Sequence, residues 1–531
     1  MVSTPSISLD IYWTSFDAGD DDLDYIINLL LEREIPLTTE EMAHAIVKHR
    51  LERLEQEAEE TEAPNYPLYL PGGTYKKKQV LNFPVLGNKV GTIVGVRPGE
   101  NPDLGEFDVI KVKFEGEGNP REFAANLEDH ILNRPPEPEL ETEDVDSADG
   151  VMGRYGPVIE ERLESRLEES DDIIRIAGNW FPRALVAEIT EGHLNLAEAV
   201  LDVSEGGPLP TSDLLEHVEL PSDLSSQLAE FSFNYAMQED DRFDEVGPAG
   251  EVLWYLKRLE PPEVLYTPPR LECNKVMIER SLLTDDLLSL EDDLHDELNP
   301  PLESVEPVQE LSFPLLFPHW RVGALPLSPR LSTMFPTAYE APRIRVIFVD
   351  AHSGDTFPGW VVRNQGYVFG LEDWIKRYDV PPGGIVIVKV GEKAGEIVVE
   401  TIDRRMRNDW IRTITIDEQD RIGFTMLKQP VGTEYDDLMV IGLIDPQVLD
   451  EAWLQGRQRN MPVDRIVAHV FRELAKLTPQ SAVHARTLYA AVNVIQRHPP
   501  AVIFHELVSR PYYVHVGDLY WRFESSAWES S

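Results

Sequence analysis

Two stretches of this chain, about 270 residues apart, end in the same hairpin pattern. The pattern is an aromatic residue, then Val-Gly, a short turn and a Trp, and it occurs in 243–256 (FDEVGPAGEVLWYL) and 513–523 (YVHVGDLYWRF). A glycine turn between two apolar runs is typical of a β-hairpin, and a Trp on the return strand can close a small core. Because helical sequence precedes both hairpins, we expect residues 192–258 and 463–523 each to form three helices and a hairpin with its Trp buried.

Length and charge limit the classes of protein that this chain can be. At 531 residues, 42% of them hydrophobic, it is long enough for several folded domains. Its net charge of −47 repels nucleic acid in general, so any contact with DNA requires locally basic modules. The single Cys273 excludes a disulfide framework. Because no apolar run approaches the roughly 18 residues of a membrane span and the start does not resemble a signal peptide, we predict a cytoplasmic protein without a membrane partner.

The N-terminal part predicts a helical segment followed by a small barrel. Residues 1–63 form a helix-turn-helix-like start, in which Thr38 and Glu41 have the spacing of a capping box. No hairpin follows the second helix, so a helical hairpin that caps the next domain is an equal alternative. Short alternating segments in 64–134 resemble the SH3-like barrels of KOW and Tudor type, which usually contact nucleic acid, ribosomes or polymerase. A spacer barrel is the alternative there.

Charge and proline content divide the middle of the chain. Residues 135–150 are predicted to form an acidic linker, 151–260 a winged helix, and 261–335 an acidic, proline-rich connector. Six short strands within 336–450 predict a larger β barrel. Their order of strand, helix, Pro-Gly turn and strand resembles the DNA-binding pseudobarrels of plant transcription factors and restriction-enzyme effector domains. The predicted fold class is therefore α+β and multidomain, with winged helices, an SH3-like small barrel and a larger β barrel.

The C-terminal segment, 451–531, carries the most specific resemblance. Its runs HARTLYAAVNVI and YYVHVGDLYWRF resemble HARE-type winged helices, the fold of the delta subunit of bacterial RNA polymerase. The matching positions are Thr487, Leu488, Tyr489, Val516, Gly517, Trp521 and Phe523. The segment around 192–258 joins this resemblance by internal analogy, although its hairpin is three residues longer. The resemblance implies a winged-helix fold and, as partners, DNA, RNA, RNA polymerase or another protein.

The same C-terminal segment is locally basic. The segment from Arg457 to Phe523 contains nine Lys and Arg residues but only four acidic residues, whereas the chain as a whole is acidic. In a winged helix the second helix of the turn motif commonly enters the major groove and the wing reaches the phosphate backbone. We therefore predict nucleic-acid contacts at His484, Arg486, Arg497, Arg510 and Arg522. Pairing of these charges with the acidic linkers of the same chain is the alternative.

A second basic cluster surrounds Trp410 in the run DRRMRNDWIR. Arginine beside an aromatic ring suits base stacking combined with phosphate contact. The predicted nucleic-acid contacts in this cluster are Arg404, Arg405 and Arg407. A solvated strand edge is the alternative, because neighbouring aspartates partly cancel the charge.

Motifs of catalysis are missing from the sequence. There is no Walker loop, no G-x-S-x-G elbow and no H-E-x-x-H pair. The run DAHSGD brings Asp350, His352 and Asp355 together, but a polar turn between strands explains it. We therefore predict a non-enzymatic transcription- or chromosome-associated factor without cofactor or metal, which binds DNA through the C-terminal segment. The alternatives are a protein-interaction scaffold and an accessory specificity subunit of a restriction or defence system.

Overall fold

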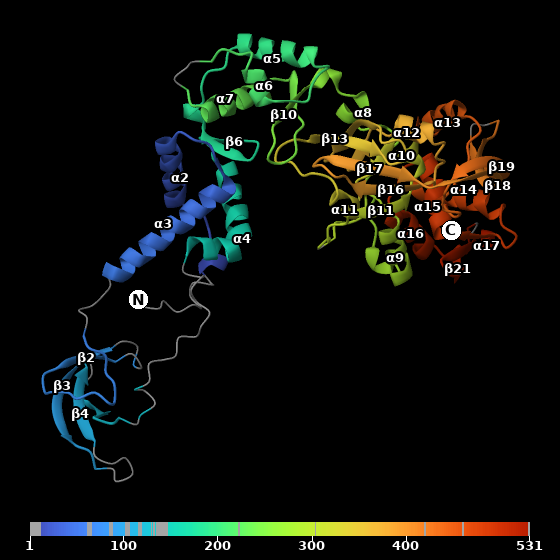
Figure 1. Ribbon diagram of the computed structural model, residues 1–531. Helices are drawn as coiled ribbons and strands as arrows, with labels where there is room; N and C mark the ends of the chain where they lie inside the picture. Colours follow the sequence, from blue (N-terminus) through green and yellow to red (C-terminus); the bar gives the residue numbers. More distant parts are fainter. Residues whose placement is uncertain are drawn as a thin grey trace. The chain divides into compact units, whose positions relative to one another are not determined.

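Helices and sheets alternate along the part of the chain that the structure describes, so the fold class is mixed α+β (Figure 1). Tertiary contacts divide the chain into two units, Met1–Ile174 with Trp180–Ala184 and Arg175–Asn179 with Leu185–Ser531. The computed structural model describes residues 12–60, 66–83, 86, 89–100, 107–114, 119–128, 130, 133, 147–220, 224–302, 304–418, 421–458 and 461–528. Most of the predicted acidic linker, 135–150, lies outside these ranges. None of the helices within them combines the length and the apolar composition that a membrane span requires.

The N-terminal part of the chain contains a three-helix module whose sequence is interrupted. Its elements are α2 (Asp20–Arg33), β1 (Leu37–Thr38), α3 (Thr39–Glu60), α4 (Ala148–Glu168), β6 (Ile173–Ile176) and β7 (Asn179–Pro182). The short first strand pairs with the hairpin in the order β1-β7-β6, and α3 packs along α4. The hairpin that the sequence did not reveal after residue 63 is therefore β6–β7. This corrects the predicted domain 151–260, whose first part belongs to the N-terminal module.

Two local sequence patterns, a capping box and a four-residue apolar repeat, form in the helices of this module as the sequence predicts. The Thr38 backbone N–H donates to Glu41 Oε2 at 2.9 Å, and the Glu41 N–H donates to Thr38 Oγ1 at 3.2 Å. This reciprocal pair is the predicted capping box at the start of α3. The four-residue spacing of Ile159, Leu163 and Leu167 places all three on the fully buried face of α4.

A small antiparallel sheet is inserted between α3 and α4 in the sequence. Its strands follow chain order: β2 (Val80–Phe83), β3 (Lys89–Pro98), β4 (Asp108–Phe114) and β5 (Arg121–Ala125). Strand β4 alternates between buried and exposed side chains, which places Ile110, Val112 and Phe114 in the core of this sheet. The predicted short β segments of 64–134 are therefore present as a four-stranded meander.

Two further segments repeat the element order of the first module. The second module consists of α5 (Glu191–Val203), β8 (Leu209–Pro210), α6 (Thr211–Leu215), α7 (Ser226–Gln238), β9 (Phe243–Glu245) and β10 (Leu253–Leu256). The third consists of α14 (Val463–Ala475), β20 (Ala482–His484), α15 (Ala485–Ile495), α16 (Pro500–Ser509), β21 (Tyr513–Gly517) and β22 (Tyr520–Phe523). Their sheets have matching orders, β8-β10-β9 and β20-β22-β21. Trp254 and Trp521 are only 1% and 7% exposed, as the repeated hairpin pattern predicts.

Between these two modules lies a curled seven-stranded sheet. Its spatial order is β11 (Glu310–Pro314), β16 (Ile385–Val390), β17 (Glu396–Thr401), β13 (Arg343–Asp350), β14 (Thr356–Val362), β15 (Tyr367–Phe369) and β12 (Ala324–Pro326). Strands β11 and β12 come from 261–335, so that segment is more than the predicted extended connector. Both are edge strands, where proline is tolerated because one side of the strand needs no ladder hydrogen bond. The predicted helix follows β15 as α12 (Glu372–Arg377).

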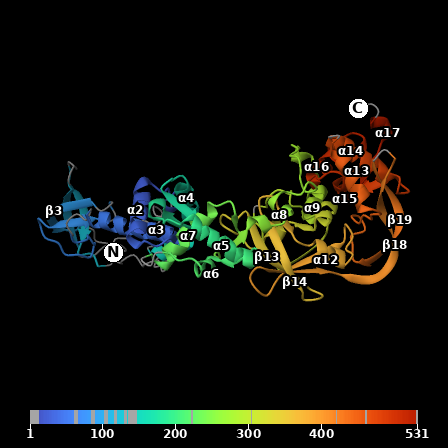
Figure 2. The same ribbon diagram turned by 90° about the horizontal axis from the view of Figure 1, so that it is seen from above.

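A long two-stranded ribbon leaves the sheet and runs to the third module. It consists of β18 (Asp403–Ile416) and β19 (Ile422–Thr433), and Figures 1 and 2 both place it beside α14. Ile414 and Phe424 near its turn are buried in one core with the third module. The remaining helices are α8 (Pro262–Leu265), α9 (Asp285–Asp293), α10 (Phe317–Val322), α11 (Pro329–Ser332), α13 (Pro446–Gln458) and α17 (Ser525–Trp528).

Candidate nucleic-acid interface

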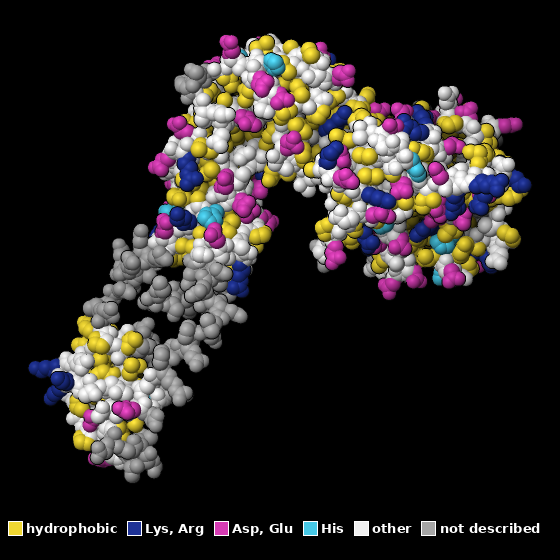
Figure 3. Space-filling model, in the orientation of Figure 1, with side chains coloured by type: hydrophobic (Ala, Val, Ile, Leu, Met, Phe, Trp, Pro, Cys, Tyr) yellow, Lys and Arg dark blue, Asp and Glu magenta, His cyan; other side chains and the backbone are white. Residues whose placement is uncertain are grey.

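The ribbon exposes an aromatic and basic surface at the end nearer the seven-stranded sheet. Trp410 is 63% exposed and Met406 is 64% exposed, although both are large apolar side chains. Trp410 pairs with Lys428 across the ribbon, and Lys428 Nζ lies 5.4 Å from the centroid of the indole ring. A group of Lys and Arg side chains lies over this part of the molecule in Figure 3. We call Arg404, Arg405, Met406, Arg407, Trp410 and Lys428 the ribbon patch.

Carboxylates neutralise only part of the ribbon patch. Arg404 Nη2 lies 2.5 Å from Glu434, and Arg407 Nε lies 2.6 Å from Asp409. For Arg405, as for Lys428, no carboxylate of the described residues lies within ion-pair distance. The ribbon patch therefore contains two cations that can bind phosphate, Arg405 on β18 and Lys428 on β19. Lys428 was missed in the sequence because only the strand register brings it beside Trp410.

Two of the predicted contacts in the third module have structural partners instead. His484 is the N-cap of α15, and its Nδ1 accepts a hydrogen bond from the Arg486 backbone N–H at 3.0 Å. Burial and the nearby Arg486 charge lower the pKa of His484, so the ring is neutral near pH 7. Arg486 Nη1 lies 2.7 Å from Asp436. Both side chains therefore have partners within the chain, although neither of these partners lies in a predicted acidic linker.

Arg510 and Arg522, two further predicted contacts of this module, differ in their surroundings. Arg510 Nε lies 3.0 Å from Glu506, one helical turn earlier. Arg522 is exposed on β22, opposite Val514 of β21. No described carboxylate lies within ion-pair distance of Arg522. The hairpin therefore offers one available cation where the sequence predicted a basic wing.

Arg497 is fully buried, which corrects its prediction as a phosphate contact. Its guanidinium lies 2.5 Å from Asp296 and 2.8 Å from Glu297, and none of the three side chains is more than 4% exposed. Both acids belong to the predicted connector, so long-range folding brings them to this arginine. The burial of the neighbouring helix also opposes groove insertion, because every side chain from Thr487 to Val494 is buried. Helix α16 in turn packs against α9.

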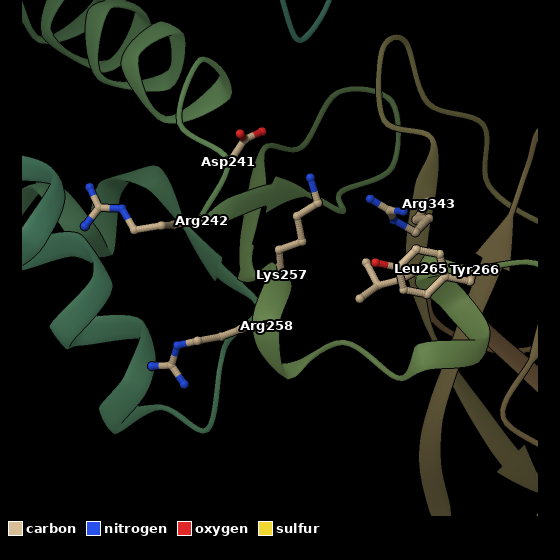
Figure 4. A pocket seen from close by; sticks show the side chains of 7 residues that line it. All are labelled: Asp241, Arg242, Lys257, Arg258, Leu265, Tyr266 and Arg343. Atoms are coloured by element: carbon tan, nitrogen blue, oxygen red, sulfur yellow. The ribbon is translucent and has the colours of Figure 1, made fainter.

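A second group of cations lines a hollow of about 560 Å³ beside β10 (Figure 4). Its cationic members are Arg242, Lys257, Arg258 and Arg343. Figure 4 shows Arg242 and Arg258 pointing away from Lys257. Carboxylates of the same unit pair with all three arginines. Among these four cations Lys257 alone has no ion pair with a described residue, so the hollow offers less to a phosphate chain than the ribbon patch.

The DAHSGD run forms a hydrogen-bonded turn between β13 and β14. The buried Asp350 carboxylate accepts hydrogen bonds from Tyr378 Oη at 2.7 Å, Ser353 Oγ at 2.9 Å and the His352 N–H at 3.0 Å. Burial opposes the charge, but these donors hold the pKa of Asp350 below its usual range. His352 Nε2 is 2.8 Å from the Thr401 carbonyl oxygen. The described residues contain no group of three or more His, Cys, Asp or Glu arranged to hold a metal.

Comparisons of this chain with models of protein families, with curated proteins and with solved structures gave no match.

Proposed function

We propose that this chain is a non-enzymatic, multi-module factor that binds nucleic acid through the ribbon patch. The observation that carries the proposal is the exposure of Trp410 with Lys428 at its ring and Arg405 exposed on the same strand, where neither cation has a carboxylate partner among the described residues. A two-stranded ribbon fits the major groove, and an exposed indole can stack on an unpaired base. The acidic remainder of the chain limits binding elsewhere by repulsion.

We infer that the three repeated modules are winged helices and that the inserted sheet is an SH3-like barrel. The support is the shared order of helix, strand, helix, helix and hairpin, with the short strand next to the second hairpin strand in each sheet. Their third helices do not favour groove binding, because α7 and α16 contain no Lys or Arg. In α4 the arginines stand among a larger number of acids. The modules therefore serve as spacers or protein-binding units, and nucleic acid binds to the ribbon patch.

Salt-dependent binding tests this proposal. We expect the full-length protein to bind a labelled DNA duplex or single strand at low salt, with affinity that falls steeply as salt rises. The double variant Arg405→Ala/Lys428→Ala should lower the slope of log affinity against log salt by about 1 for each lost phosphate contact. Trp410→Ala should weaken single-strand binding by roughly 1–3 kcal/mol and duplex binding by less.

A charge-matched variant controls for general electrostatics. Lys393 and Lys476 are exposed, lie outside the ribbon and each pair with a nearby glutamate. Lys393→Ala/Lys476→Ala removes the same two charges from the chain and should leave the slope nearly unchanged. Equal losses in both double variants, or no DNA binding at low salt, would reject the ribbon patch as the interface.

A protein-interaction scaffold is the second candidate, favoured by the hairpin of the third module. Val514, Val516 and Tyr520 are exposed on β21 and β22, with Arg522 opposite Val514. An exposed apolar surface of this kind is typical of a protein contact. RNA polymerase is one partner to test. Val516→Glu should abolish such a contact while DNA binding by the ribbon patch persists, whereas unchanged partner capture would exclude this surface.

A further inference from the structure

A pocket of about 830 Å³ lies on the outer face of the seven-stranded sheet, in the second unit. Strands β13, β14 and β15 form its base, and the end of β10 and the start of α12 form its sides. Its aromatic lining consists of Tyr255, Phe357, Trp360, Phe369 and Trp374. We propose that this pocket binds a nucleotide, with Arg345 holding its phosphate and aromatic rings contacting its base.

Arg345 is the first reason for an anionic ligand. The alternation of β13 buries Ile344 and Val346 in the core and turns Arg345 to the opposite face, where it pairs with Trp360 of β14. Its guanidinium carbon lies 4.7 Å from the Trp360 ring centroid and 5.7 Å from that of Tyr255. These contacts fix the guanidinium in place but leave its N–H donors without a carboxylate among the described residues.

A partly buried cation without an ion-pair partner is costly, and an anionic ligand would reduce that cost. Burial lowers the pKa of Arg345, and Tyr255 and Glu260 offset this effect only in part. The other arginine of the pocket differs, because Arg377 Nη1 lies 2.9 Å from Asp355. Arg345 is therefore the cation of this pocket that is available to bind an anionic ligand.

The other side chains that line the pocket indicate which chemical groups are attached to the anionic group of the ligand. Phe357 and Phe369 are partly exposed in the pocket wall and offer surfaces for a planar ring. Asp373 is exposed at the rim and has no ion pair with a described residue, whereas Glu372 pairs with Lys376 at 2.6 Å. A free carboxylate accepts hydrogen bonds from ribose hydroxyls or from the amino group of a base. A phosphate, a planar base and hydroxyl donors occur together in a nucleotide.

The size of the pocket agrees with this ligand class. Pockets for small ligands and cofactors usually measure about 300–1,000 Å³ and combine apolar walls with a few fixed polar groups. The nucleotide can be free or can be one unit of a nucleic-acid strand. The pocket uses no residue of the ribbon patch, so it goes beyond the proposed function and does not rest on it.

Calorimetric titration of the full chain tests the pocket. We expect adenosine and uridine 5′-monophosphate to bind, and inorganic phosphate alone to bind at least about tenfold more weakly because it lacks the stacking ring. Arg345→Met keeps the apolar stem but removes the charge, and should weaken monophosphate binding at least about tenfold. Arg363→Met is the matched control, since Arg363 donates to the Ala341 carbonyl oxygen and does not line the pocket.

A second variant guards against misfolding, because Arg345 packs between two rings. Asp373→Ala changes an exposed side chain, so it should weaken monophosphate binding while the melting temperature stays that of the wild type. A single-stranded decamer distinguishes the two sources of the nucleotide. Competition by adenosine 5′-monophosphate for the decamer assigns the pocket to a strand, and binding of the monophosphate without competition assigns it to a free nucleotide.

Two results would overturn the proposal. One is the absence of monophosphate binding at millimolar concentration. The other is binding that is equal for inorganic phosphate and the monophosphates, or that survives both Arg345→Met and Asp373→Ala. The ribbon variant Arg405→Ala/Lys428→Ala should leave monophosphate binding unchanged, which separates failure of the pocket from failure of the proposed function.

Discussion

The Arg497 guanidinium donates to the Asp296 carboxylate at 2.5 Å although 201 residues separate them in the sequence. Both side chains are fully buried. Glu297 lies 2.8 Å from the same guanidinium, and the Tyr489 hydroxyl also contacts Asp296. Burial opposes the charge on Arg497, but the two carboxylates raise its pKa above the usual range. The pair ties α15 and the segment after it to the chain that follows α9.

Removal of the arginine should destabilise this part of the molecule. Arg497→Met leaves two buried carboxylates without their cation, and breaking such a pair costs about 3–5 kcal/mol. We expect a clearly lower melting temperature for the second unit in thermal unfolding followed by circular dichroism. Arg465→Met is the control, because Arg465 is exposed and lies 3.9 Å from Asp464, where an ion pair contributes at most about 1 kcal/mol. Equal effects of the two substitutions would contradict the assignment.

The neighbouring His498 should make stability depend on pH. Burial and the Arg497 charge lower its pKa to about 4, so the folded ring stays neutral where the unfolded ring is already protonated. The unfolded state then binds more protons between about pH 6.5 and 4, and this histidine lowers stability as the pH falls through that window, by up to roughly 3 kcal/mol.

The variant His498→Phe should remove this acid sensitivity. Urea unfolding of the variant and the wild type at pH 7.0, 5.5 and 4.5 measures it as the difference between the two proteins, so contributions of other titrating groups cancel. The exposed His217 provides the control substitution, His217→Phe. A wild-type curve that parallels the His498→Phe curve at all three pH values would refute the prediction.

The two hairpin tryptophans should respond differently to the same substitution. Trp254 Nε1 donates to Asn234 Oδ1 at 3.0 Å, and the same Nε1 lies 3.2 Å from Thr211 Oγ1. Trp521 Nε1 is buried without a hydrogen-bond partner among the described residues. Trp254→Phe therefore loses packing and also leaves buried polar atoms with an unmade bond, an added cost of about 1–3 kcal/mol. Chemical denaturation should show a smaller loss for Trp521→Phe, and the reverse order would contradict this reading.

The small sheet should be removable from the first module. His44 of α3 lies 2.8 Å from Asp149 at the start of α4, so the remaining part of α3 up to Glu60 runs about 24 Å beyond the contact. A flexible Gly-Ser linker of about 15 residues in place of 61–146 spans that distance. We expect hydrogen exchange of α3 and α4 in the shortened full chain to match the wild type. Lost protection of α4 would show that the sheet is needed for the module.

Local patterns in the sequence were sufficient wherever a structure depends on neighbouring residues. The Val-Gly hairpins predicted the burial of Trp254 and Trp521, and the Thr38 and Glu41 spacing predicted the start of α3. Each of these signals involves residues within one hairpin or one helical turn, where periodicity and turn chemistry are decisive. The β-rich character of 336–450 also followed from alternation alone.

Contacts between residues that are distant in the sequence determined the features that local patterns did not predict. The insertion of the small sheet hid the first module, since its third helix and hairpin begin far beyond α3. Strand register placed Lys428 beside Trp410 and turned Arg345 toward a pocket. Tertiary contacts with Asp296 and Glu297 buried Arg497, which a local count of charge had assigned to a basic surface. The sequence by itself determined the local elements and the charge of each segment, whereas only the tertiary structure decided which charges stay exposed, because burial depends on partners that are remote along the chain.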